Sequence, residues 1–289
     1  MPRRRSRVAR RWRPRLRRLG IAALFAAVGS GLWYAEEREV RERLSWMGVP
    51  TWERPTPLSL HRVLRNDGYL VGWSDLRVGS LWASYQLRAD RRFPVGDRPG
   101  FRRDWRTLWP LTPNAYRRSG YDRGHLAPNY AIAAAHGPAA QRDTFLMSNM
   151  MPQRPDLNRR LWQRLEEVVV DHFLPRFGRL QVIAGPVFAD DVAAGVLHRV
   201  GLVEVPVAFY KILVVPGRHP RALAFLMPQD VDGGEPLDRF LVSVDRIEAM
   251  TGLDFLPNLS EEAAAALEGR VVTEGWGLAA VADLPGRFE

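Results

Sequence analysis

The sequence predicts an α+β fold, with a mainly antiparallel sheet flanked by helices and one transmembrane helix before it. Short runs rich in β-branched and aromatic residues alternate irregularly with segments of helical period, which favours α+β over a doubly wound parallel sheet. The charge-free run 19–35 follows an arginine-rich leader, as in a membrane anchor. The chain of 289 residues leaves room for one large domain after this anchor.

The leader, residues 1–18, contains ten arginines and no acidic side chain. It accounts for the whole formal net charge of +10, because the remaining 32 Lys and Arg balance 32 Asp and Glu. The positive-inside rule places the leader in the cytoplasm, 19–35 in the membrane and the rest in the periplasm or outside the cell. A cleaved signal peptide is the alternative, since 27–29 is Ala-Val-Gly, and cleavage would give a secreted domain.

Residues 36–56 have the composition of a stalk, and 57–289 form the predicted folded domain. Alternating or continuous apolar runs predict strands at 69–73, 81–87, 180–184, 203–207, 210–215 and 222–226. Helical spacing of apolar residues predicts helices at 157–173, 237–251 and 260–267. The absence of cysteine excludes disulfides, thiolate zinc sites and cysteine nucleophiles.

The segment Asp122-Arg-Gly-His125 carries the first candidate site residues. His125 is a candidate general base, because an imidazole of ordinary pKa, near 6.5, suits proton transfer near neutrality. Its deprotonation would make the rate rise with pH. In an extended segment Arg123 lies on the same side as His125, and a guanidinium fork there suits a phosphate or a carboxylate. Gly124 between them permits close backbone approach.

Two further candidates, Asn158 and Glu166, lie on the predicted helix 157–173. Eight α-helical steps leave them about 80° apart around the axis, so they share a side but do not easily ligate one ion together. Glu166 would reach a metal through water, and Mg²⁺ tolerates such a sparse set of oxygen ligands. Singly, each residue also has a structural explanation, such as a helix cap or a solvated surface. Their joint occurrence within a short stretch points to chemistry.

This arrangement resembles the DNA/RNA non-specific endonucleases, the family of the Serratia nuclease and endonuclease G. The Asp-Arg-Gly-His block with Asn158 and Glu166 in register carries the resemblance, which covers about 69–260. It implies the ββα-metal (His-Me finger) fold. It also implies that His125 activates water, that Asn158 directly binds one Mg²⁺, for which Mn²⁺ substitutes, and that Glu166 holds a metal-bound water.

The same resemblance implies further site residues. Arg123 matches a phosphate-contacting arginine, and Asn149 matches an asparagine that supports the site. An upstream arginine steadies the phosphate in the family, and Arg102 and Arg103 fit that role equally well. Segment 98–125 holds seven arginines against two aspartates, and 154–164 holds four against one, so both carry local positive charge that would attract a polyanion.

The resulting prediction is a membrane-anchored, Mg²⁺-dependent endonuclease that cuts DNA and RNA and leaves 5′-phosphate ends. Because its proposed contacts go to phosphate and none reads a base, cleavage should depend little on sequence. A homodimer is a further partner that the resemblance allows. Two alternatives stay open: a catalytically silent, membrane-anchored receptor that binds or takes up DNA with the same fold, and a hydrolase for another phosphodiester.

Overall fold

The computed structural model describes residues 8–189 and 198–286, with side chains given for residue 21 and from 23 onward. The chain divides into two compact units, and the second begins at Leu44. The expected boundary at 57 is therefore too late. Part of the expected stalk belongs to the domain, because β1 (Thr51–Trp52) pairs with β13 (Leu253–Asp254). The leader residues 1–7 lie outside the described residues.

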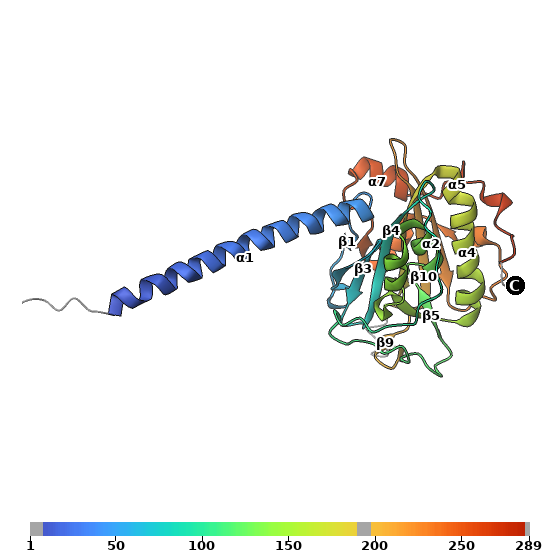
Figure 1. The fold of residues 1–289 in the computed structure, drawn as a ribbon. Helices are drawn as coiled ribbons and strands as arrows, with labels where there is room; N and C mark the ends of the chain where they lie inside the picture. The colour runs from blue at the N-terminus through green and yellow to red at the C-terminus, as the bar shows by residue number, and fades with distance from the viewer. Residues whose placement is uncertain (1–7, 190–197, 287–289) are drawn as a thin grey trace, which may run out of the picture. The chain divides into compact units, whose positions relative to one another are not determined.

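The first unit is one long helix, α1 (Val8–Leu44) (Figure 1). Within the described residues, no helix has an apolar stretch long enough to cross a membrane. The predicted transmembrane helix at 19–35 is therefore not supported. The expected location of the domain depended on this segment and stays a prediction.

The second unit is built on one antiparallel sheet of seven strands, as expected for the α+β class. Across the sheet the order is β12 (Leu241–Val242), β11 (Arg221–Pro228), β10 (Ala208–Val215), β7 (Arg179–Val187), β4 (Gly79–Arg88), β3 (Tyr69–Ser74) and β2 (Arg62–Asn66). The central strands are almost continuously buried, which is why they appear in the sequence as apolar runs rather than as alternating patterns. The helices α2 and α4 lie in front of this sheet (Figure 1).

The helices are short and surround the sheet. They are α2 (Asn129–His136), α3 (Pro138–Asp143), α4 (Trp162–Val168), α5 (Leu174–Phe177), α6 (Val244–Thr251) and α7 (Glu261–Glu268). The described residues also contain the 3₁₀ turns η1 (Pro57–Ser59), η2 (Met147–Asn149), η6 (Leu237–Phe240) and η7 (Leu278–Ala280). Two π segments, η3 (Leu157–Leu161) and η4 (Val169–Phe173), extend α4 at its two ends.

Two predicted elements differ from the structure. The expected helix 237–251 contains η6, the strand β12 and α6 instead, because Leu241 pairs with β11 and the Ser243 hydroxyl caps a new helix. The expected strand 203–207 shrinks to β9 (Val203–Glu204), which pairs with β8 (Arg199–Val200). Pro206 has no N–H to donate to a ladder, so the strand cannot continue through it.

Gly185 in β7 marks a point of very close packing in the central sheet. It stands opposite Tyr210 of β10, whose hydroxyl donates to the Leu81 carbonyl at 2.9 Å. A Cβ at position 185 would overlap both that carbonyl oxygen and the Tyr210 hydroxyl. Only glycine therefore lets this buried hydrogen bond form.

We expect Gly185→Ala to lower the free energy of unfolding by about 3 kcal/mol, through overpacking and loss of the Tyr210 hydrogen bond. Urea denaturation followed by circular dichroism measures this. Gly100→Ala is the matched control, because a Cβ there meets no atom within 4 Å. Equal denaturation midpoints for the two variants would contradict the packing argument.

Candidate active site

The strand β5 (Asp122–His125) pairs antiparallel with β6 (Met150–Gln153), away from the main sheet. Gly124 faces the side chain of Gln153 so closely that a Cβ would overlap it. The helical stretch that follows β6 packs back onto the pair, because the Trp162 indole nitrogen donates to the His125 carbonyl at 3.2 Å. Two strands and one helix thus form the ββα unit that the sequence resemblance implies.

The π segment η3 sets the direction of Asn158 relative to Glu166. A π turn takes up roughly one extra residue without extra rotation, so the eight steps between them turn the chain about as far as seven α-helical steps. The two side chains then lie within about 20° of one face, instead of the 80° that an uninterrupted α-helix gives. Both line the same cleft.

His125 lies at the wall of this cleft, and its side chain is largely buried. Its ring packs against Phe101 and Phe145, with centroids 5.9 and 5.1 Å away. Its Nε2 atom has no hydrogen-bond partner among the described residues. Burial, together with the positive charges of Arg98 and Arg123, lowers the pKa of His125 to about 3. The imidazole is therefore neutral at physiological pH, and the expected rise of rate through pH 6.5 is not what this environment predicts.

Asp122 holds the beginning of the helix. It accepts a hydrogen bond from Asn158 Nδ2 at 3.0 Å and two from Arg159, at 2.7 and 2.8 Å. Partial burial alone would raise the pKa of Asp122, but the hydrogen bonds from Arg159 and Asn158 outweigh it and lower the pKa. Because Asn158 uses its amide nitrogen for Asp122, its side-chain oxygen is the atom left to bind a ligand.

Glu166 forms an ion pair with Lys211, which lies on β10 in the main sheet. The Nζ atom of Lys211 is 3.1 Å from Oε1 of Glu166 and 4.0 Å from the centre of the Trp162 ring. Lys211 is fully buried. Burial raises the pKa of Glu166 and lowers that of Lys211, and their mutual attraction opposes both shifts. Sequence reasoning gave Lys211 no role; its place as the only lysine of the chain was the available signal.

Two arginines of the cleft carry no carboxylate partner among the described residues. The Arg123 guanidinium stacks 4.0 Å from the Phe101 ring and donates to the Pro113 carbonyl at 2.8 Å. Arg98 lies 5.5 Å from the centre of the Phe145 ring. Both line the cleft, so their charge is available to a bound anion.

The other predicted arginines are placed elsewhere. Arg102 and Arg103 are exposed and are not among the cleft-lining residues. Arg102 donates to the Arg142 carbonyl at 2.7 Å, and Arg103 lies over the Trp105 ring at 5.4 Å. Of Arg98, Arg102 and Arg103, only Arg98 lines the cleft.

Asn149 is fully buried and does not line the cleft. Its side chain accepts a hydrogen bond from the Ala127 amide at 2.9 Å and donates to the Ala127 and Thr144 carbonyls at 2.8 and 2.9 Å. It therefore fixes the chain just after His125, and its place is that of a positioning residue.

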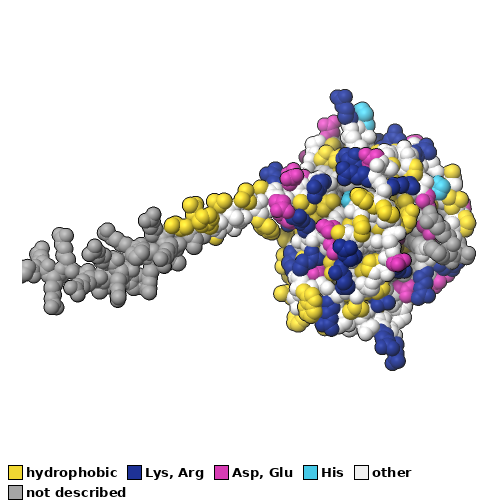
Figure 2. Space-filling view, in the orientation of Figure 1, with side chains coloured by type: hydrophobic (Ala, Val, Ile, Leu, Met, Phe, Trp, Pro, Cys, Tyr) yellow, Lys and Arg dark blue, Asp and Glu magenta, His cyan; other side chains and the backbone are white. Residues whose placement is uncertain are grey.

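The cleft has a volume of about 1190 Å³, which is large enough to hold the sugar and phosphate groups of a bound nucleotide segment. Its polar lining combines a neutral histidine, arginines, an asparagine amide and carboxylates. Asn158 and Glu166 offer oxygen atoms, and oxygen donors with few protein ligands fit a hard cation such as Mg²⁺. Elsewhere on the domain, basic side chains are scattered among acidic and apolar ones on the face shown in Figure 2.

We expect the ring-proton resonances of His125 to stay constant between pH 5 and 9 in EDTA, because the buried imidazole is already neutral there. NMR titration of the full chain, with assignment by His125→Gln, measures this. In urea, where the chain is unfolded, the pKa of the same residue should be near 6.5. Because the folded state binds fewer protons than the unfolded state between about pH 3 and 6.5, His125 destabilises the fold as the pH falls through that window. A midpoint between 6 and 7 in the folded chain would contradict this environment.

Comparison with known proteins identifies the family of the chain. A family model described as DNA/RNA non-specific endonuclease matches residues 51–262. A nuclease of Nostoc sp. (strain PCC 7120) is 33% identical over 242 residues, covering 78% of this chain and 84% of its own. Human mitochondrial endonuclease G is 36% identical over 217 residues, covering 69% and 71% of the two chains.

The fold agrees as well. The structure of the EndoG/EndoGI complex matches with a TM-score of 0.66 at 24% identity, over 80% of this chain and 97% of that one. This likeness confirms the mixed fold with its mainly antiparallel sheet, and the matches in sequence confirm the resemblance drawn from the Asp-Arg-Gly-His block. The chain belongs to the DNA/RNA non-specific endonuclease family.

Proposed function

We propose that this nuclease hydrolyses phosphodiester bonds in both DNA and RNA, with His125 as the general base, in a reaction that requires Mg²⁺ or Mn²⁺. The observation that carries the proposal is the neutral, buried imidazole with an unpaired ring nitrogen, at the wall of a cleft that also holds two arginines without carboxylate partners. The neutral imidazole has a free ring nitrogen that can accept a proton, and the negative charge of a bound phosphate would raise its pKa toward that of an effective general base.

Arg123 and Arg98 bind and orient the phosphate. The Arg123 guanidinium lies 4.0 Å from the Phe101 ring and that of Arg98 lies 5.5 Å from the Phe145 ring. Neither is paired with a described carboxylate, so both can donate to a phosphate. In the transition state they offset the charge that builds on the non-bridging oxygens. Because these contacts address the sugar–phosphate backbone, the proposal includes cleavage with little sequence preference and no choice between ribose and deoxyribose.

Asn158 and Glu166 would hold the metal ion, the first through its side-chain oxygen and the second through a water molecule. When bound, the ion supplies positive charge next to the scissile phosphate and the leaving oxygen. Asp122 keeps the Asn158 oxygen directed to the ligand by accepting from its nitrogen. The Lys211 ammonium opposes the rise in the pKa of Glu166 that burial causes, and it holds the carboxylate in place. His125 removes a proton from the attacking water, and departure of the 3′ oxygen leaves a 5′-phosphate end.

We expect the full chain to cut both supercoiled plasmid and RNA in MgCl₂ or MnCl₂ and neither in EDTA. His125→Ala should lower the cleavage rate by about 10²–10⁴-fold, the usual contribution of a general base, while gel-shift binding in EDTA is kept. The matched control, His219→Ala, changes an exposed histidine outside the cleft and should keep full activity.

Each failure of this assay has a distinct meaning. If neither nucleic acid is cut in any divalent cation, the catalytic proposal is wrong, and binding without cleavage would favour a silent receptor. If His125→Ala loses binding together with cleavage, the histidine is structural. Products that polynucleotide kinase labels without prior phosphatase treatment would contradict 5′-phosphate ends.

We expect Lys211→Met to raise the Mg²⁺ concentration for half-maximal cleavage by about 10-fold or more, as is usual when a group that orients a metal ligand is lost. Without the ammonium group, burial raises the pKa of Glu166 further and favours its protonated form. Cleavage rates at increasing MgCl₂ measure the effect, with circular dichroism to verify folding.

The double variant Lys211→Met/Glu166→Gln separates structure from function. It removes the carboxylate that the single variant leaves buried and unpaired, so its denaturation midpoint should lie above that of Lys211→Met. Its activity should stay low. An unchanged Mg²⁺ dependence in Lys211→Met would show that Lys211 does not position Glu166.

A further inference from the structure

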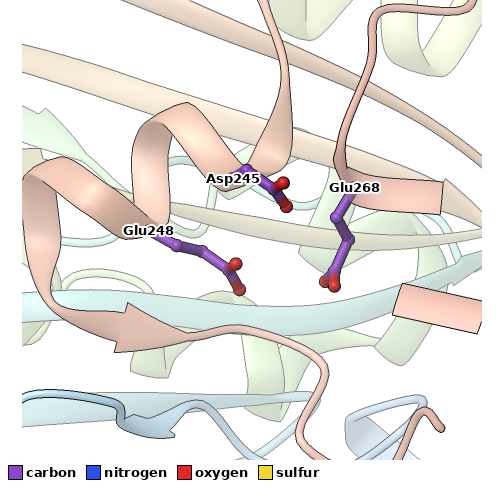
Figure 3. Close-up of side chains that lie close together, drawn as sticks. All are labelled: Asp245, Glu248 and Glu268. Atoms are coloured by element: carbon purple, nitrogen blue, oxygen red, sulfur yellow. The ribbon is translucent and has the colours of Figure 1, made fainter. Parts of the chain in front are cut away.

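Three carboxylates from two helices meet outside the nuclease cleft. Asp245 and Glu248 belong to α6, and Glu268 is the last residue of α7. One oxygen atom of each lies within 4.8 Å of the others, and Figure 3 shows the three side chains directed toward one another. None of the three lines the cleft, so this acidic cluster is separate from the catalytic residues.

Local structure brings the cluster together. The Ser243 cap starts α6, and the spacing of three places Asp245 and Glu248 on the same side, one turn apart. The Phe255 amide donates to Oε1 of Glu248 at 2.9 Å, which fixes the direction of that carboxylate. The Ser260 cap starts α7, which runs until Glu268 faces the other two.

Glu268 provides an independent indication of a ligand. Its side chain is only 5% exposed, and its Oε1 atom has no hydrogen-bond partner among the described residues. A buried carboxylate oxygen without a partner costs free energy. Its position in Figure 3 directs that carboxylate into the cluster rather than to solvent. A cation there would supply the missing partner.

The charge around the cluster is uncompensated. None of its three carboxylates forms an ion pair with a described arginine or lysine, and Asp254 and Glu53 add negative charge nearby. Glu268 also stands at the C-terminus of α7, where the helix dipole disfavours an anion.

We propose that Asp245, Glu248 and Glu268 bind a calcium ion that joins α6 to α7. Three atoms separated by at most 4.8 Å lie within about 2.8 Å of a common point, which a small shift brings to the 2.3–2.6 Å of calcium–oxygen bonds. Mg²⁺ requires distances near 2.0–2.1 Å and stricter geometry. The ligand set contains oxygen alone, which does not favour zinc or copper. The exposed side of Asp245 leaves room for water ligands.

Thermal unfolding of the full chain tests the site. We expect 1 mM CaCl₂ to raise the Tm by about 4 °C relative to EDTA, which is the shift for a site with a Kd near 100 μM in a domain of this size. The same concentration of MgCl₂ should give a smaller shift. Calorimetric titration with CaCl₂ should find one site per chain that the cluster variants lose.

Variants locate the calcium. Glu268→Gln removes the buried charge, and Asp245→Asn changes an exposed ligand with little risk to folding; both should abolish the Tm shift. Glu262→Gln is the matched control, because it changes an exposed carboxylate of α7 outside the cluster. Asn158→Ala should keep the calcium shift, because it alters only the nuclease cleft.

Three results would overturn the proposal. The first is a Tm that does not change with CaCl₂. The second is a shift that persists in both Asp245→Asn and Glu268→Gln. The third is a shift lost in Asn158→Ala, which would place the calcium in the cleft. A chain that is stabilised by acidification alone, with no effect of CaCl₂, would show that the carboxylates share protons instead.

Discussion

One buried ion pair, Lys211 with Glu166, connects the central sheet to the helix that carries the active site. Removing both charges from water is costly, and the pair is stable only because the two groups are 3.1 Å apart and the ammonium also faces the Trp162 ring. Trp162 in turn donates to the His125 carbonyl. The sheet, the helix and the strand that carries His125 are therefore held together through three adjacent contacts.

A second set of contacts, made by arginines of the cleft, explains how a domain with almost no net charge can attract a polyanion. The net charge of the chain lies in its leader, whereas the cleft depends on a few guanidinium groups whose partners are aromatic faces and a carbonyl rather than carboxylates. Arg159 also lines the cleft, but its guanidinium is already paired with Asp122. Local pairing, not total charge, decides which cations are available to phosphate.

Much of the fold and most of the site can be predicted from the sequence. The strands of the central sheet appear as apolar runs because both of their faces are buried, and the predicted site residues His125, Asn158 and Glu166 all line one cleft. The direction of the Asn158 side chain around the helix axis is not predictable, because the π segment depends on how the helix packs. Arg98 cannot be distinguished from Arg102 or Arg103 in a segment without regular period. The role of Lys211 emerges only when β10 meets the helix. The alanine-rich α2 carries no clear polar face, so its pattern does not indicate a helix.

Because Lys211 is buried, the accessibility of its ε-amine reports whether the domain is folded. Since the chain has a single lysine and the fold encloses it, reagents and proteases that need an ε-amine find no target in the intact domain. Lys211 becomes accessible to such reagents and proteases only when β10 separates from the helix that carries Glu166. Lysine acetylation or lysine-directed cleavage of this enzyme thus follows opening of the active site itself, with no background from surface lysines.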